Sequence, residues 1–316
     1  MGLVMATNLQ KHLQSAGGPA LQYTNRTLSR GVPLQELGAV PRANAAELIA
    51  SSDIIFASLS DDAALAATVD AMLSDAADLT GKIVVDTSTV HPASSAKAAD
   101  RLRERGVEFV AAPVFGASPV AAKGQLLFII AGPGAAVQAV EPFIVGVMGR
   151  GIIRVGEDVQ KATTMKTAGA NRLMPARNFI TAGMMELIAE AHVFAEKTGL
   201  GSEAMEPLLE QQYGPLAFTM SQRLTTGAYM PPKDQRPWSD LNLALKDVGH
   251  GIKCAEDVGT KLEVGEVALR HLEEAKRFSD AHGRSLDSSS MYGVLREQAG
   301  LPFETSLVRR RDSGDP

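Results

Sequence analysis

The stretch Met1-Gly2-Leu3-Val4-Met5-Ala6-Thr7-Asn8-Leu9 decides the fold of the first half of the chain. A glycine followed by an apolar helical run is typical of the last part of a G-x-G-x-x-G dinucleotide loop, where a helix N-terminus faces the pyrophosphate. The strand and the first two glycines of that fingerprint do not precede it here. We therefore predict a nucleotide-binding helix without its usual first strand.

The composition is that of a globular protein with a substantial core. The chain has 316 residues, 45% of them hydrophobic and 21% charged, with a net charge of −5. This acidic balance argues against nucleic-acid and membrane partners, which require a basic surface. Cys254 is the single cysteine, so no internal disulfide can form. Without a leader pattern or an apolar run near the roughly 20 residues of a membrane span, we expect a cytoplasmic protein, and we predict no metal site.

Apolar runs and helical stretches alternate in the first half of the chain. This alternation predicts an α/β domain at 1–156 with a Rossmann-type parallel sheet. After residue 157 the apolar residues recur only with the period of a helix, and no further strand pattern follows. This predicts an all-α domain at 157–302. The segment 303–316 is rich in arginine and poor in apolar residues, and we expect it to be disordered. The expected strands are 20–24, 54–57, 83–85, 107–110, 126–130 and 152–155, and the later helices are 178–198, 203–211, 241–258, 263–282 and 288–299.

Asn25-Arg26-Thr27 follows the first expected strand. The residue at this point of a dinucleotide fold meets the adenosine ribose, and an arginine there suits the 2′-phosphate of NADP. Arg26 therefore favours NADP over NAD, with Arg30 as a possible second cation. The alternative is an ordinary surface arginine.

Two further segments follow expected strands. Ser88 and Thr89 come just after the strand at 83–85, where hydroxyl groups can face the ligand crevice of an open α/β sheet. The alternative is that the segment 89–92 only caps the next helix, and both interpretations can be true together. The segment 112–117 contains a proline and a glycine, and it makes either an anion-binding backbone turn or an ordinary one.

These motifs, in this order, resemble the β-hydroxyacid dehydrogenase family, which includes 3-hydroxyisobutyrate dehydrogenases and glyoxylate reductases. The resemblance covers about residues 1–300. It implies an NADP(H)-dependent oxidoreductase whose N-terminal domain resembles that of 6-phosphogluconate dehydrogenase, and whose helical domains pair into a homodimer. The cofactor-binding residues that it implies are Gly2, Met5, Asn25, Arg26, Thr27, Leu59, Ser60, Ser88, Thr89 and Lys246.

The resemblance also locates the substrate-binding residues. Phe115, Gly116 and Ala117 stand where the family has a serine and two glycines, of which the serine and a glycine hold a substrate carboxylate. A phenylalanine in place of that serine favours a larger or less polar carbonyl compound, or an imine, over a small hydroxy acid. Trp238 and Asp247 are the other substrate-binding residues implied, and the alternative for Trp238 is core or interface packing.

Lys166 matches the catalytic lysine of the family, which precedes an asparagine in a K-x-x-x-N pattern. Removal of residues 170–177 would bring Asn178 into that register, where positions i and i+4 share a helix face. The removed segment contains Pro175, which a helix interior tolerates poorly, so we expect 170–177 to bulge out as a loop or to record a mis-spliced gene model. The resemblance implies that Lys166 is the acid–base and Asn178 its helper. Without the resemblance, we would interpret Lys166 as an ordinary solvated surface lysine.

A second class of function stays open at this point. The missing glycines, Phe115 and the separated Lys166 and Asn178 would also suit a pseudoenzyme that is retained as a dimeric binding scaffold. A chromatin-associated relative is a further possibility, which the acidic balance disfavours.

Overall fold

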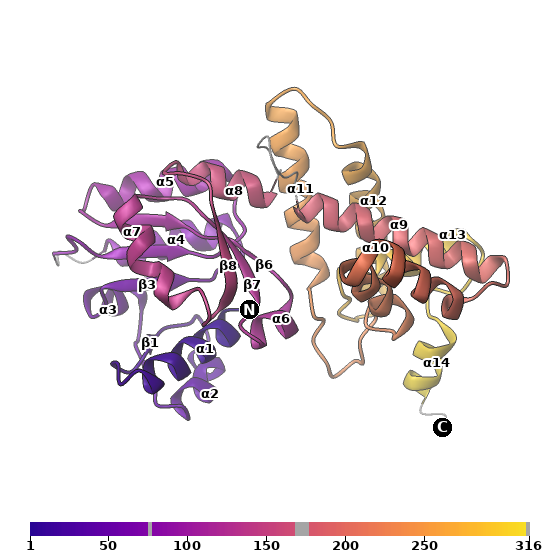
Figure 1. Cartoon of the computed structure of the whole chain (residues 1–316), viewed down its shortest axis with the longest axis horizontal. Helices are drawn as coiled ribbons and strands as arrows, with labels where there is room; N and C mark the ends of the chain where they lie inside the picture. The colour runs from indigo at the N-terminus through magenta and orange to yellow at the C-terminus, as the bar shows by residue number, and fades with distance from the viewer. Residues whose placement is uncertain (75–77, 168–176, 314–316) are drawn as a thin grey trace. The chain divides into compact units, whose positions relative to one another are not determined.

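The chain forms two compact units, Met1–Met174 and Pro175–Pro316 (Figure 1). The computed structural model describes residues 1–74, 78–167 and 177–313. The boundary lies beyond the predicted residue 156 because helix α8 (Val159–Thr167) packs with the sheet. Its Val159 and Ala162 are buried in the same apolar cluster as residues of the strands.

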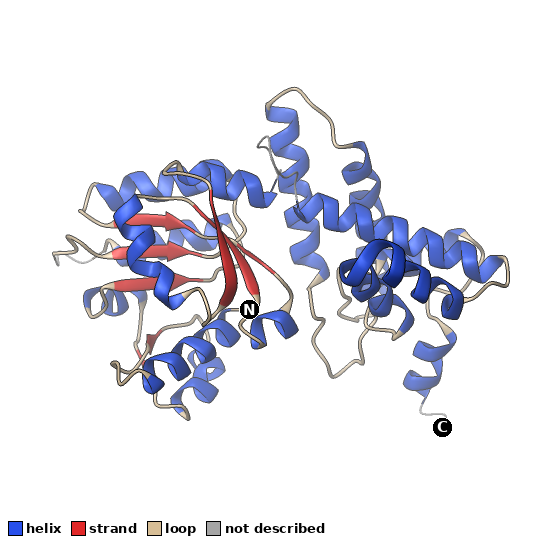
Figure 2. Ribbon diagram, viewed as in Figure 1, coloured by secondary structure: helices blue, strands red, loops and turns tan. Residues whose placement is uncertain are grey.

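Short parallel strands build the first unit (Figure 2). β1 pairs with β2, β3-β4-β5 form a parallel sheet, and β6-β7-β8 form a third group in which β6 runs antiparallel to β7. The predicted strand positions are confirmed, whereas β2 and β6, of two residues each, were not predicted. The strands are β1 (Gln22–Tyr23), β2 (Val40–Pro41), β3 (Ile54–Ala57), β4 (Ile83–Asp86), β5 (Glu108–Ala111), β6 (Val114–Phe115), β7 (Leu126–Ile130) and β8 (Gly149–Arg154).

Helices cover both faces of these strands. Successive side chains of a strand point to opposite faces, and Val84 and Val85 of β4 accordingly belong to different buried clusters. The cluster of Val84 takes residues from α3, α4, α5 and α8, and the cluster of Val85 takes residues from α1, α6 and α7. The remaining helices of the unit are α1 (Gly2–Ser15), η1 (Leu28–Gly31), α2 (Val32–Gln35), α3 (Ala45–Ala50), α4 (Asp62–Met72), α5 (Pro92–Arg103), α6 (Ser118–Ala122), α7 (Gly134–Val140) and η2 (Glu141–Phe143).

The parallel strands form a Rossmann-type sheet, as the sequence predicted. Among the described strands, β1 pairs only with β2, and β3 pairs only with β4. Helix α1 follows directly on Met1, and its Met5 and Leu9 are buried against the sheet. The helix therefore docks on the strands through its apolar face.

The second unit is entirely helical in its named elements. Its core includes Leu224, Tyr229 and Leu272, all fully buried. Helix α10 contains a kink at Gly214, whose φ of +79° is strained for other residues. No helix in the described part of the chain is long and apolar enough to cross a membrane. The helices are α9 (Arg177–Lys197), α10 (Ser202–Thr225), α11 (Leu241–Asp257), α12 (Glu263–Ala281), α13 (Met291–Gln298) and α14 (Ser306–Ser313).

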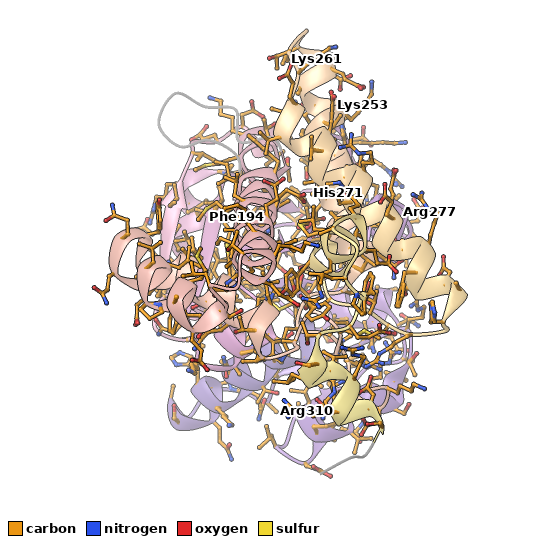
Figure 3. All side chains as sticks on the ribbon, turned by 90° about the vertical axis from the view of Figure 1, so that its right-hand side faces the viewer. Phe194, Lys253, Lys261, His271, Arg277 and Arg310 are labelled. Atoms are coloured by element: carbon orange, nitrogen blue, oxygen red, sulfur yellow. The ribbon has the colours of Figure 1, made fainter. Side chains whose placement is uncertain are left out.

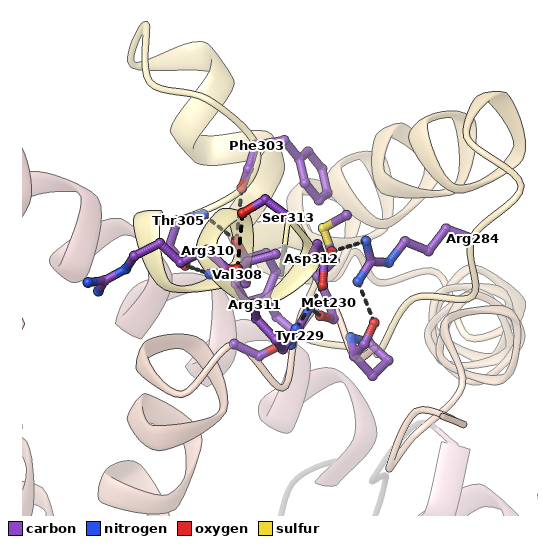
Figure 4. Close-up of polar contacts among 12 residues, drawn as sticks. Tyr229, Met230, Arg284, Phe303, Thr305, Val308, Arg310, Arg311, Asp312 and Ser313 are labelled. Carbon is purple, nitrogen blue, oxygen red and sulfur yellow. Dashed lines mark hydrogen bonds and ion pairs between the residues drawn. The ribbon is translucent and has the colours of Figure 1, made fainter. Parts of the chain in front are cut away.

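The expectation of a disordered tail was wrong, because 306–313 forms α14. Phe303 and Val308 are buried in the helical core, and the Tyr229 hydroxyl donates to the Phe303 carbonyl oxygen at 3.0 Å. Arg311 donates to the Met230 carbonyl at 2.6 Å, and Arg284 pairs with Asp312 (Figure 4). Two anchoring side chains and these ionic contacts suffice to dock a segment whose composition suggested disorder.

Candidate active site

Lys166 lies near the end of α8 with its side chain almost fully buried. The residue is 7% exposed, and its Nζ donates a hydrogen bond to the Val114 carbonyl oxygen at 2.8 Å. The same Nζ lies 4.1 Å from the centroid of the Phe115 ring. A buried ammonium group requires such compensating contacts. The structure therefore excludes the alternative of a solvated surface lysine.

Strand β6 brings Phe115 to Lys166. Phe115 pairs with Leu127 of β7 and is 6% exposed. Gly116 follows with a φ of +138°, and a Cβ atom on it would lie 2.6 Å from Leu126 Cδ2, so this turn requires glycine. Ala117 is half-buried at the N-cap of α6. Of the three predicted substrate residues on this loop, Phe115 contacts the lysine directly.

The N-terminus of α1 meets the carboxyl end of β3. A Cβ atom built on Gly2 would lie 3.2 Å from Ser58 Cβ, so the two segments approach closely. The Asn8 side chain donates to the Ala121 carbonyl at 2.9 Å and ties α1 to α6. The N-terminus of a 14-residue helix favours an anion through its dipole and amides. The small Gly2 and this helix end fit the pyrophosphate of a dinucleotide.

Hydroxyl groups tie the carboxyl ends of β3 and β4 together. Ser88 Oγ accepts from the Leu59 backbone amide at 2.8 Å, and Thr87 Oγ1 donates to the Ala57 carbonyl at 2.7 Å. Ser88 is buried and Thr89 is half-buried. His91 is the N-cap of α5 and accepts from the Ala93 amide, and Pro92 opens the helix, so the expected capping by the segment 89–92 is confirmed. The structure thus brings together Leu59 and Ser88, two of the predicted cofactor residues.

The predicted adenosine-binding residues are exposed just after β1. Asn25, Arg26 and Thr27 all lie on the surface, and Asn25 Nδ2 donates to the Thr27 carbonyl at 2.9 Å. This bond closes a short turn that carries Arg26 outward. Arg30 is also exposed, within η1. An exposed guanidinium at this strand end fits a phosphate group.

Three predicted residues lie in the helical unit. Lys246 Nζ pairs with Asp247 Oδ1 at 3.1 Å on α11, and both side chains are about one-fifth exposed, at 19% and 20%. Trp238 lies in the segment before α11 and is 47% exposed. This exposure excludes the core-packing alternative for Trp238 and leaves its interface alternative open.

The remaining predicted residues are placed as follows. Met5 is a core residue of α1, 4% exposed, so its side chain packs on the sheet. Ser60 is exposed and donates to Asp61 Oδ2 at 2.8 Å. The backbone of Asn178 lies in α9, but its side chain is outside the described residues. The predicted loop at 170–177 lies outside them as well, apart from Arg177, which opens α9.

Sequence reasoning missed two participants of the site. The Val114 carbonyl accepts from Lys166, and a backbone acceptor leaves no signal in residue type. Ser58 faces Gly2 at the end of β3, and its signal in the sequence was the partial match of the segment 58–61 to the family's cofactor loop.

Both halves of the chain match known dehydrogenase families. Residues 1–156 match the NAD binding domain of 6-phosphogluconate dehydrogenase, and residues 170–295 match the NAD-binding domain of NADP-dependent 3-hydroxyisobutyrate dehydrogenase. These two matches cover most of the chain and agree with the α/β and all-α units.

Individual relatives extend the match to nearly the whole chain. The NADH-dependent oxidoreductase ucdB of Aspergillus ustus is 32% identical over 308 residues, 96% of this chain and 99% of that protein. The 2-(hydroxymethyl)glutarate dehydrogenase of Eubacterium barkeri is 26% identical over 95% of this chain and 93% of its own length. The fold matches the Mycobacterium tuberculosis 3-hydroxyisobutyrate dehydrogenase with L-serine, with a TM-score of 0.72, 21% identity and coverage of 94% and 96% of the two chains. The chain belongs to the β-hydroxyacid dehydrogenase family of NAD(P)-dependent oxidoreductases.

Proposed function

We propose that this protein is an NADP(H)-dependent reductase of uncharged carbonyl compounds or imines, with Lys166 as its general acid and base. The observation that carries the proposal is the buried ammonium group of Lys166, held by the Val114 carbonyl beside Phe115. A general acid needs a fixed position and a proton to donate. Lys166 combines both in a family of oxidoreductases.

The cofactor supplies the hydride when it is bound. The N-terminus of α1 with Gly2 would hold its pyrophosphate, while Leu59, Ser60, Ser88 and Thr89 would line the nicotinamide side. Met5 would support this part of the site from the core of the first unit, and Lys246 is a further proposed cofactor-binding residue. Arg26 would bind the 2′-phosphate with Asn25 and Thr27 shaping its turn, which supports NADP(H) as the cofactor.

Lys166 completes the reaction by proton transfer. As hydride reaches the carbonyl carbon, the C=O π bond breaks and its electron pair takes the proton from Lys166 Nζ. The products are an alcohol and a neutral amine that regains its proton from water. In the reverse direction the neutral amine accepts the hydroxyl proton. Asn178 is the proposed helper that orients the same oxygen.

The substrate is proposed to be larger or less polar than a small hydroxy acid. Phe115 presents an apolar ring next to Lys166, where a carboxylate would find no hydrogen-bond donor on the ring. Gly116 and Ala117 would shape the adjoining turn. Trp238 and Asp247 are the proposed contacts from the helical unit.

We also propose that the protein is a homodimer that associates through its helical unit. Leu187 and Phe194 of α9 are 63% and 67% exposed, and Tyr213 of α10 is 66% exposed. Positions 187 and 194 share one face of α9, where Figure 3 shows the Phe194 side chain. Large exposed apolar side chains of this kind are typical of protein interfaces.

Turnover of NADPH against a panel of aldehydes, ketones and imines tests the catalytic proposal. We expect Lys166→Ala to abolish turnover and to leave the NADPH dissociation constant within about two-fold, because the lysine acts on the substrate. Lys161→Ala is the matched control, since Lys161 is an exposed lysine of the same helix. Unchanged turnover in Lys166→Ala would remove the lysine from the mechanism.

The rival function is a pseudoenzyme that serves as a dimeric scaffold. Phe115, which stands beside Lys166 where the resemblance places a serine, favours it. Titration of the purified protein with NADPH and NADH separates the two functions. Failure to bind either cofactor, with an intact dimer, would support the scaffold.

A further inference from the structure

We infer that Phe115 is a positioning residue, whose ring face holds the Lys166 ammonium in place and selects substrates without a carboxylate beside the reacting carbon. The inference rests on the proposed function for its catalytic consequence. Its structural part stands on the contact of 4.1 Å between Lys166 Nζ and the ring centroid.

The Phe115 ring is itself held firmly. It belongs to a buried cluster that contains Val90, Ala111 and Ala162, and only 6% of the residue is exposed. Its backbone is fixed by pairing with Leu127 in β7. Ala162 lies on α8, one turn before Lys166, so the helix that carries the lysine packs on the cluster that holds the ring.

The ring face and the Val114 carbonyl approach the same nitrogen. A cation over an aromatic face is stabilised, and more strongly where water is excluded. Lysine has a long flexible stem, and each added contact removes some of its rotamer freedom. Two neighbouring residues of β6 therefore fix the direction of the ammonium group before a substrate arrives.

The same ring disfavours an anionic substrate group. The face of an aromatic ring carries partial negative charge, which attracts an ammonium and gives a carboxylate no favourable contact. The ring also offers no N–H or O–H donor to a buried carboxylate. The surroundings of Lys166 Nζ on β6 thus suit a ketone, aldehyde or imine with apolar substituents.

Two substitutions separate the ring face from simple core filling. Phe115→Leu keeps an apolar side chain but removes the aromatic ring. Phe115→Tyr keeps an aromatic ring at the same position. We expect kcat to fall by about ten-fold in Phe115→Leu and to recover in Phe115→Tyr, because one cation–π contact corresponds to roughly this factor. The KM for NADPH should change little in either variant. Equal kcat in wild type and Phe115→Leu would overturn the positioning role.

Phe109→Leu is the matched control for core damage. Phe109 lies in β5, is 3% exposed and belongs to the same buried cluster as Phe115. We expect this variant to lower the melting temperature and to keep kcat. If Phe109→Leu and Phe115→Leu lose kcat in proportion to their melting temperatures, the role of Phe115 is structural only.

Substrate choice gives a second readout of the ring. Phe115→Ser removes the negative ring face and adds a hydroxyl donor beside Lys166. We expect its kcat/KM for a small 3-oxo carboxylate, relative to an uncharged ketone of similar size, to rise by about ten-fold, since one hydrogen bond to a charged group supports this change. An unchanged ratio would contradict the selecting role.

Chemical labelling distinguishes failure of this inference from failure of the proposed function. Acetylation with an N-hydroxysuccinimide ester, followed by peptide mass spectrometry, reports on each lysine without turnover. We expect slow labelling of Lys166 in wild type and in Phe115→Tyr, and labelling faster by about three-fold or more in Phe115→Leu, with exposed Lys161 as the internal reference. If the labelling rates follow this order but no substrate is turned over, the contact between Lys166 and Phe115 is supported and the proposed enzymatic function is rejected. Equal labelling in all three proteins would reject the contact itself.

Discussion

The backbone amide of Leu59 donates to the Ser88 hydroxyl at 2.8 Å, which joins the loops that follow β3 and β4. Ser88 is 3% exposed, so Ser88→Ala leaves this amide without its hydroxyl acceptor. We expect a loss of about 1–3 kcal/mol in the free energy of unfolding, and weaker NADPH binding because the Leu59 loop loses its anchor. Urea denaturation and a fluorescence titration measure the two effects. The control is Ser15→Ala, an exposed serine at the end of α1, and equal effects in both variants would contradict the role of Ser88.

Arg26→Ala tests the cofactor preference. The guanidinium is exposed after β1, and loss of one hydrogen bond to a charged phosphate costs about 1.5–3 kcal/mol. We expect the NADPH dissociation constant to rise by about 10- to 100-fold and the NADH constant to stay nearly unchanged. Arg103→Ala, an exposed arginine of α5, serves as the control. A wild-type protein that binds NADH more tightly than NADPH would reject the proposed preference.

Phe194→Glu tests the proposed dimer. A charge on the exposed face of α9 would have to be buried in a close interface, which is unfavourable without a partner. We expect wild type to have twice the chain mass by light scattering and Phe194→Glu to have the mass of one chain. Val258→Glu, at a 73% exposed position that ends α11, should remain dimeric. A wild-type protein with the mass of one chain would contradict the proposed dimer.

Asp287→Ala should destabilise the helical unit strongly. The carboxylate is fully buried, pairs with Arg223, and accepts from the backbone amides of Ser239 and Ser289 at 2.8 Å and 3.0 Å. Removal of one partner from a buried ion pair costs about 3–5 kcal/mol. Urea denaturation followed by circular dichroism measures the loss. Asp280→Ala breaks an exposed pair with Lys276, so it should cost less than about 1 kcal/mol, and a similar loss in both variants would contradict the assignment.

His192 predicts a pH dependence of stability. Its Nε2 lies 2.7 Å from Ser221 Oγ, and burial lowers its pKa below the ordinary value of 6.5 while Glu206 acts in the opposite direction. The unfolded chain therefore binds more protons than the folded chain as the pH falls below 6.5. The stability that the neutral imidazole contributes is present above that pH and is lost as the pH falls through the folded pKa.

Melting temperatures of wild type and His192→Asn between pH 5 and 8 test this dependence. We expect wild type to lose stability on acidification and His192→Asn to show a flatter profile. At pH 8 the variant should be less stable by about 1 kcal/mol, since its shorter side chain loses a hydrogen bond. Parallel profiles for the two proteins would assign the acid sensitivity to other groups.

Local patterns predicted the elements better than their packing. The apolar runs at 54–57 and 126–130 form β3 and β7, because a strand that is buried on both faces consists of consecutive apolar residues. Helix α8 was not among the predicted helices because polar residues surround its two buried apolar residues, Val159 and Ala162. The prediction of a disordered tail was wrong because composition gives the number of charged residues but not their partners. Asp312, for example, pairs with Arg284.

The sequence by itself determined the division into an α/β half and a helical half and the positions of the longer strands. These depend on periodicity and on residue types that are close together in the chain. Only the tertiary structure decided that Lys166 of α8 is buried against β6, because its hydrogen bond to the Val114 carbonyl joins positions 52 residues apart. No local pattern encodes a contact at that separation, since it exists only when the helix and the strand pack together.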